Sequence, residues 1–180
     1  MKTENLKRYL ESFGANVVKE AKGVLSSVKG NTALGNSIRV QVDEEQKGVS
    51  VKFFMLDYGT YLDKGVSGNN VTRSFTNYKL VNETSPYKYT TKQPPPDILS
   101  RWVKKKGIKP KGLGRGRDFK TGQYISNLAF IIGKKIKARG IPSISFFQEP
   151  LGTNYALLKE QLLSEFKEDV QVYLTTFTKN

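Results

Sequence analysis

One stretch of the chain carries almost all of its surplus charge. The 180 residues include 30 Lys and Arg and 16 Asp and Glu, which gives a formal net charge of +14 at pH 7. Residues 101–139 hold 13 of the basic side chains and a single acid, Asp118, so this segment alone carries +12. A segment this basic repels itself in isolation. It therefore needs solvent, a polyanionic partner or a counter-charged neighbour.

Two residue types that serve much of enzyme chemistry are missing. The chain has no His and no Cys, which excludes disulfides, Cys/His zinc sites and Ser-His-Asp or Cys-His catalytic sets. Any metal would have to be held by oxygen atoms alone. The carboxylates show no recognisable spacing for acid–base work, and an enzyme with an all-oxygen metal site is the least favoured hypothesis. We expect no enzymatic activity, no cofactor and no metal.

The composition is that of a folded chain. The hydrophobic fraction is 37%, and 10 Phe, 9 Tyr and 1 Trp supply material for a core, so global disorder is not expected. The length suits a single domain over residues 1–180. No apolar run approaches the roughly 20 residues of a membrane span, and the N-terminus lacks the apolar region of a signal peptide. We expect synthesis in the cytoplasm and no membrane contact.

The first element is a long helix. Apolar residues recur every three or four positions over residues 4–29, which predicts an amphipathic helix, and Gly30 is placed to end it. The alternatives are a helix that faces the core and a helix that binds a partner, of which the first is favoured. Two interior glycines, Gly14 and Gly23, each weaken the helix by roughly 1 kcal/mol relative to Ala or permit close packing.

A β-hairpin follows the helix. Residues 38–43 and 49–54 alternate between apolar and polar side chains, which predicts two half-buried strands joined by a turn. We expect a turn-rich connector at 31–36 and a third extended segment at 58–66. The acids Asp43, Glu44 and Glu45 are interpreted as a solvated hairpin tip in preference to a metal site.

A second helix is expected at 98–106. Asp97 is predicted as its N-cap. Its apolar face is predicted to consist of Ile98, Leu99, Trp102 and Val103.

Two more helices are expected nearer the C-terminus. The pattern predicts one at 122–139 and another from about 155 to 169, whereas 141–151 is expected to be extended. Residues 170–178 fit either a helix or a strand. The fold class is therefore α+β: a long N-terminal helix and central helices packed on a small antiparallel sheet, with a long inserted loop or hairpin.

The inserted region covers residues 67–121. Its first part, 67–96, is polar and rich in aromatic residues, allows a hairpin around 78–81 and 87–90, and ends in three prolines that form a stiff spacer. Loops of this length are usually functional. The candidate residues for contact between subunits are Tyr78, Tyr87, Tyr89 and Trp102.

Cations dominate the second part of the insertion. They suit contact with DNA phosphates or with an acidic protein partner, and a solvated surface is the plain alternative. The Gly-rich run 112–117 lacks the spacing of a phosphate-binding loop. Lys and Arg at 134–139 are explained by the dipole at a helix C-terminus. The candidate contact residues are Arg101, Lys104, Lys105, Lys106, Lys109, Lys111, Arg115, Arg117 and Lys120.

Two stretches together carry a family resemblance. The first is Asp57-Tyr58-Gly59-Thr60-Tyr61-Leu62-Asp63-Lys64-Gly65-Val66, which follows the hairpin, and residues 32–38 precede that hairpin. The second is the helix, the turn and the Phe146-Phe147 pair within 123–151. The pattern resembles the minor head–tail joining proteins (neck or tail-completion proteins) of tailed bacteriophages. Ala33 stands where the family has glycine, Asp63 stands at its acidic position, and Gly65-Val66 replaces Gly-Thr.

The resemblance implies a fold and a role. It implies a compact α+β domain that assembles into an oligomeric ring between the capsid portal and the tail, with DNA passing through. The implied partners are further copies of the chain, a portal or adaptor protein, tail proteins and, non-specifically, double-stranded DNA. The implied location is the neck of the virion, after assembly in the host cytoplasm. The alternative is a non-enzymatic nucleic-acid-binding accessory protein that uses the basic segment 101–120.

Overall fold

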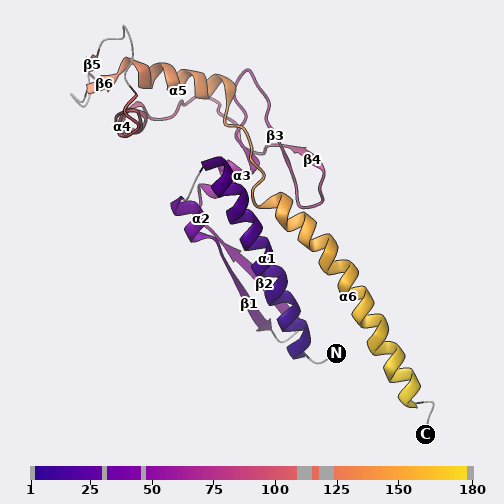
Figure 1. Ribbon diagram of the computed structural model, residues 1–180. Helices are drawn as coiled ribbons and strands as arrows, with labels where there is room; N and C mark the ends of the chain where they lie inside the picture. The colour runs from indigo at the N-terminus through magenta and orange to yellow at the C-terminus, as the bar shows by residue number, and fades with distance from the viewer. Residues whose placement is uncertain (1–2, 30–31, 46–47, 109–114, 118–123, 178–180) are drawn as a thin grey trace. The chain divides into compact units, whose positions relative to one another are not determined.

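The computed structural model of the protein describes residues 3–29, 32–45, 48–108, 115–117 and 124–177. The fold class is α+β: helices alternate with short antiparallel strand pairs (Figure 1). The chain divides into two compact units. Unit 1 comprises residues 1–63, 76–82 and 145–180, and unit 2 comprises residues 64–75 and 83–144. The predicted insertion, 67–121, falls in unit 2 except for 76–82.

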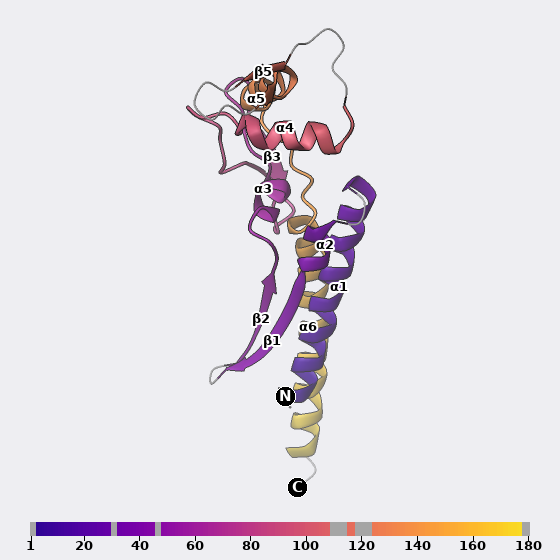
Figure 2. The same ribbon diagram turned by 90° about the vertical axis from the view of Figure 1, so that its left-hand side faces the viewer.

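Unit 1 is built around its first helix. Helix α1 (Thr3–Lys29) packs against strand β1 (Arg39–Glu45) and against the long helix α6 (Gln148–Phe177). Strand β1 pairs antiparallel with β2 (Gly48–Phe54), and the two run as a ribbon along α1 (Figure 2). Helix α2 (Ala33–Ser37) connects α1 to the hairpin, and α3 (Gly59–Lys64) follows the hairpin.

The core of unit 1 forms where α1 meets the hairpin and the start of α6. Gly14 permits the close approach of α1, because a Cβ there would lie 2.6 Å from Cγ2 of Val40. The Phe53 ring lies with its centroid 6.3 Å from that of Phe13 and 5.3 Å from that of Phe147, both edge to face. The largest fully buried side chains are Phe146, Leu25, Leu34, Ile38 and Val17.

Unit 2 contains a helix pair. Helix α4 (Pro96–Lys105) packs on α5 (Asn127–Arg139), and β6 (Tyr124–Ser126), which leads into α5, pairs antiparallel with β5 (Arg115–Arg117). The close packing of the helices depends on Gly133, where a Cβ would lie 3.4 Å from Cδ1 of Leu99 and 3.5 Å from the Pro94 carbonyl oxygen. A short hairpin of β3 (Ser74–Thr76) and β4 (Asn82–Thr84) begins and ends in unit 2.

Backbone hydrogen bonds tie the start of unit 2 to the end of α5. We call residues 65–70 and 137–143 the backbone clasp. Val66 and Ile141 exchange two N–H···O bonds of 2.8 Å, and the Asn69 N–H donates to the Lys137 carbonyl at 2.9 Å. The two segments of the clasp lie so close that a Cβ on Gly140 would collide with the Val66 carbonyl oxygen. Gly140 also has a φ of +72°. Only glycine meets both demands.

Several sequence predictions are confirmed. The N-terminal helix, the β1–β2 hairpin and helices near 98–106 and 122–139 are all present. The region 170–178, left open between helix and strand, is helical through Phe177, since α6 runs to that residue.

Three predictions of local structure are wrong. Residues 31–36 contain α2, because the Thr32 hydroxyl accepts the Gly35 N–H at 3.2 Å and caps a short helix. The segment 58–66 is mostly helix α3, since Gly59 and Asp63 are buried one helical turn apart. The last helix begins at Gln148 and not near 155, so the segment expected to be extended over 141–151 ends at Phe147.

Other elements differ by position. The hairpin expected around 78–81 and 87–90 forms from β3 and β4 instead. The fourth helix starts at Pro96, and its N-cap residue is Pro95, not Asp97. Proline is already set for the first helical position, so the helix starts there and Asp97 falls in its first turn. Helix α5 begins at Asn127 because 124–126 is used by β6.

Candidate binding surfaces

Three of the predicted cations lie at the surface of helix α4, and a fourth, Lys106, is its C-cap residue. Arg101, Lys104, Lys105 and Lys106 are all exposed. Arg101 is partly neutralised, since its Nη2 donates to Oδ2 of Asp97 at 3.3 Å, one helical turn away. The lysines follow at the C-terminal end of the helix, where the helix dipole favours cations. The structure therefore brings these four residues together as a surface cluster.

The other predicted cations fall in the segment after α4. Arg115 and Arg117 lie in β5, opposite Ser126 and Tyr124 of β6. Lys109, Lys111 and Lys120 lie outside the described residues.

Helix α4 also exposes apolar side chains that were predicted to belong to one apolar face. Ile98 is 53% exposed and Trp102 is 44% exposed, whereas Val103 is only 4% exposed. Leu99 is half-buried. The buried face is centred near Val103, and the predicted apolar face was too wide. The contrast between Ile98 and Val103 was not visible in the sequence, because both are β-branched hydrophobic residues.

Helix α5 also exposes apolar side chains near cations. Phe130 and Ile131 are each 46% exposed, so neither belongs to the buried side of the helix. Nζ of Lys134 lies 5.8 Å from the centre of the Phe130 ring. Lys137 Nζ donates to the Thr91 carbonyl at 2.7 Å, which gives this cation a structural role in unit 2.

The four aromatic candidates for subunit contact are divided between the two units. Tyr78 belongs to unit 1, and the other three belong to unit 2. Tyr78 is exposed, and its N–H donates to Oε1 of Gln148 at 3.1 Å. Tyr87 and Tyr89 are half-buried and bond through their backbones to Ser67. Burial raises the pKa of the Tyr89 hydroxyl. Of the four, Tyr78 and Trp102 are exposed enough to serve as contacts.

Asp63 is a structural residue that the sequence did not reveal as one. Its side chain is 3% exposed. One carboxylate oxygen, Oδ1, accepts the Phe147 N–H at 2.8 Å and the Gln148 N–H at 3.3 Å, and the Asp63 carbonyl accepts the Ser145 N–H at 3.1 Å. A carboxylate at the N-terminus of α6 is also favoured by the helix dipole. Asp63 therefore fastens the end of α3 to the start of α6.

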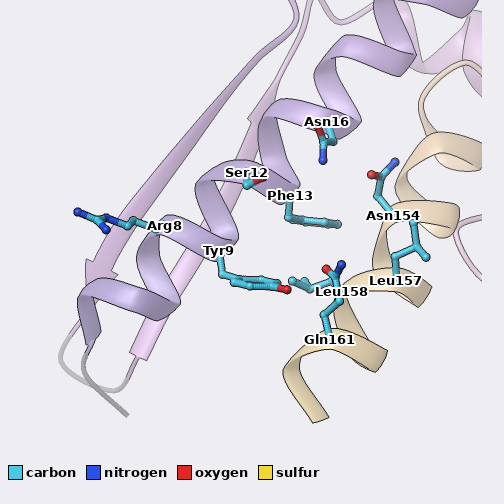
Figure 3. Close-up of a pocket in the computed structure, with 9 residues that line it drawn as sticks. All are labelled: Arg8, Tyr9, Ser12, Phe13, Asn16, Asn154, Leu157, Leu158 and Gln161. Atoms are coloured by element: carbon cyan, nitrogen blue, oxygen red, sulfur yellow. The ribbon is translucent and has the colours of Figure 1, made fainter. Parts of the chain in front are cut away.

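A cleft of about 380 Å³ lies between α1 and α6 in unit 1. Tyr9 and Phe13 extend from α1 toward α6, where Leu158 lies (Figure 3). Among the described residues that line the cleft, Arg8 has the only formal charge. The lining therefore offers no carboxylate–base pair for catalysis.

The hairpin acids make ion pairs. The pKa of Asp43 is lowered by hydrogen bonds from Gln41 and then from Lys52, whose Nζ lies 3.0 Å from Oδ2. Glu44 accepts from Lys7 at 3.1 Å, and this contact raises the pKa of Lys7. No group of three or more acids is arranged to hold a metal within the described part of the chain.

The two units differ sharply in charge. By residue count, unit 1 holds 13 Lys and Arg and 13 Asp and Glu, a net charge of zero. Unit 2 holds 17 Lys and Arg and 3 Asp and Glu, a net charge of +14. The whole surplus of the chain therefore belongs to unit 2, including residues that the predicted segment 101–139 omits.

Comparison with known proteins adds no relative. Protein-family models, curated proteins and solved structures all give no match to this chain. Separately, none of the helices in the described ranges has the length and apolar composition needed to cross a membrane.

Proposed function

We propose that the chain is a structural subunit of the neck of a tailed bacteriophage. In this proposal, copies form a ring that joins the capsid portal to the tail around the path of the DNA. The proposal starts from the resemblance carried by residues 57–66 and 123–151. It places the protein in the host cytoplasm during assembly and in the virion neck afterwards. The partners are further copies of the chain, a portal or adaptor protein, and tail proteins.

The observation that carries the proposal is the meeting of these two stretches. Asp63, from the first stretch, accepts hydrogen bonds from Phe147 and Gln148 of the second. Val66 and Ile141, also from the two stretches, exchange a pair of backbone bonds. Residues 75 to 85 positions apart in the sequence are thus joined at two places, which supports interpreting the pattern as one structural feature and not as two chance similarities.

The surface also suits a subunit that packs against neighbours. Large apolar side chains are exposed in both units, among them aromatic residues, which are enriched in protein interfaces. Single exposed apolar residues are ordinary on any protein. Neighbouring ones, such as Tyr58 and Tyr61 on unit 1 and Ile98 and Trp102 on unit 2, are typical of surfaces that a partner covers.

The test is made on virus particles. Mass spectrometry of purified virions should detect the protein, and particles made without its gene should be filled heads and tails that fail to join. Restoring the wild-type gene should restore joined particles. Normal, infectious virions that lack the protein would contradict the proposal. Mixing the purified chain with the portal, followed by light-scattering mass measurement, should give a complex of several copies.

A second candidate function is non-enzymatic nucleic-acid binding. The observation that favours it is the ratio of 17 cations to 3 acids in unit 2. Each phosphate neutralised by a cation adds about 0.9 to the slope of log affinity against log salt on duplex DNA. Replacing Lys104, Lys105 and Lys106 with Gln should then lower that slope.

Exposed lysines of the neutral unit provide the control for this experiment. Lys19 is exposed on α1, and Lys19→Gln removes one cation from unit 1 without touching unit 2. It should leave the slope unchanged. If the triple variant also leaves the slope unchanged, the α4 cluster is not a DNA contact. If the wild-type chain binds no duplex at low salt, the second function is wrong.

A further inference from the structure

The outer side of helix α4 presents two parallel rows of side chains. At 3.6 residues per turn, residues four apart lie in one row. Ile98 and Trp102 form an apolar row, and both are exposed. Arg101 and Lys105 form a cationic row beside it, and both are also exposed. We call these four residues the α4 outer face.

This combination is poorly explained by solvent or by duplex DNA. In water, the apolar surface of the two side chains stays exposed, which is unfavourable. Phosphate groups interact with cations but make no favourable contact with an aliphatic residue such as Ile98. Asp97 adds a negative charge at the N-terminal end of the same side and pairs with Arg101. A phosphate backbone would be repelled there.

We propose that the α4 outer face binds an acidic protein segment that carries apolar side chains between its carboxylates. Its apolar side chains would cover Ile98 and Trp102, and its carboxylates would pair with Lys105 and with Arg101 or Lys104. Trp and Arg are the residue types that most often dominate the energy of such contacts. The inference rests on the proposed function for the assembly that contains this partner. The chemistry of the partner is inferred from the side chains of α4.

A second copy of unit 2 does not have this chemistry. Unit 2 carries 17 cations and 3 acids, so two of these units would repel each other. Unit 1 is neutral, with 13 charges of each sign. Neither unit has the net negative charge that would attract unit 2 over long range, so overall charge complementarity favours a different protein that is acidic as a whole.

The sequence supplies its own reporter at this face. Trp102 is the only Trp in the chain, so intrinsic tryptophan fluorescence of the full-length protein reports on this position alone. Three probes are titrated: an acidic peptide with Leu side chains between its Glu residues, the same peptide with Leu replaced by Ser, and duplex DNA. The Leu-containing peptide should shift the emission to shorter wavelength, because it removes Trp102 from water, and the other two should not.

Two pairs of variants separate apolar from charged contributions. Ile98→Ser should weaken binding of the Leu-containing peptide about tenfold, equivalent to about 1.4 kcal/mol, with no effect on the Ser-containing peptide. Val28→Ser, at an equally exposed position of unit 1, should change neither. Lys105→Gln should weaken both peptides, and Lys19→Gln should weaken neither. Circular dichroism checks that each variant keeps its fold.

Three results would overturn the inference. They are the absence of binding to the Leu-containing peptide, equal binding of the two peptides, and a short-wavelength shift with duplex DNA that Ile98→Ser abolishes. The last result would assign the face to nucleic acid. Absence of the protein from virions is a separate measurement, and it would overturn the neck proposal while leaving the fluorescence result intact.

Discussion

Unit 1 and unit 2 are stabilised in different ways. In unit 1, α1 and the segments just before β1 and α6 supply most of the buried apolar side chains, including Leu25, Ile38 and Phe146. In unit 2, fewer apolar side chains are buried among the described residues, and the backbone clasp contributes hydrogen bonds between segments about 70 residues apart. Unit 1 is electrically neutral, and unit 2 carries +14.

The difference in net charge affects the stability of the two units. A neutral unit with a side-chain core can fold without electrostatic cost, whereas a unit with 17 cations experiences self-repulsion unless salt or a partner reduces it. Glycine-dependent backbone packing lets unit 2 keep its shape while most of its charged side chains remain at the surface.

The largest effect is expected at the core of unit 1. Phe146 has an exposed fraction of 0%, and Phe146→Ala should lower the free energy of unfolding by about 3–5 kcal/mol, through lost burial and the cavity left behind. Urea denaturation measures it. Phe130→Ala on α5 is the matched control, since its ring is 46% exposed, and should cost less than about 1 kcal/mol. Similar losses for both would show that unit 1 has no special core.

The next effect is expected at Asp63. Asp63→Ala leaves the buried Phe147 N–H and the part-buried Gln148 N–H without this acceptor, which should cost about 2–3 kcal/mol. Asp63→Asn retains an oxygen that can accept these bonds and should cost clearly less. Thermal denaturation of the two variants gives the comparison. Equal destabilisation would mean that the negative charge, and not the hydrogen bonding, fastens α3 to α6.

A smaller effect is expected at the backbone clasp. Gly140→Ala forces a residue with a Cβ to adopt φ +72 against the Val66 carbonyl, which should cost about 1–3 kcal/mol. Hydrogen exchange should show faster exchange at Val66, Asn69 and Ile141, with the β1–β2 amides unchanged. Gly23→Ala is the control, because a Cβ there meets nothing within 4 Å. Faster exchange throughout both units would contradict the separation.

The parts of the fold that the sequence predicted are those with local causes. Helix α1 and the hairpin follow from the spacing of apolar residues, which depends on each element alone. Helix α3 was missed because six residues are too few to show a helical repeat, and because Gly59 at its start is buried against Leu34 and Met55, which lie elsewhere in the sequence. The same holds for the division into units, which depends on contacts between segments far apart in the chain.

The charge of the candidate site was predictable from the sequence, but the exposure of its apolar side chains was not. Counting residues located the cations of α4, and the structure confirms their exposure. The sequence could not show that Ile98 and Trp102 are exposed, because a helix wheel gives the apolar side but not where the neighbouring helix covers it. Asp63 matched the acidic position of the family pattern, but its burial was not predictable, since a buried carboxylate and a surface one look alike in a sequence.

Raising the salt concentration should stabilise unit 2 slightly more than unit 1. Raising the salt from about 0.1 M to about 1 M shortens the screening length from about 10 Å to about 3 Å. Repulsion within unit 2 should weaken, so exchange protection of α4 and α5 amides should rise about threefold, or about 0.6 kcal/mol. Amides of β1 and β2 in unit 1 serve as the internal control. An equal rise in both units would indicate a general salt effect and remove charge from the comparison.

The smallest effect is expected at the hairpin of unit 1. The pKa of Asp43 lies below its ordinary value of 3.8, first because of the hydrogen bond from Gln41 and second because of the bond from Lys52. A carboxyl whose pKa is lowered on folding stabilises the fold above the unfolded pKa, and this contribution is lost as pH falls through the folded pKa. NMR titration should give Asp43 a midpoint below 3.8, raised by Gln41→Ala more than by Lys52→Met. Since the carboxyl is exposed, stability at pH 7 should barely change in Asp43→Asn. A large loss there would show that unit 1, despite its apolar core, also depends on its charges.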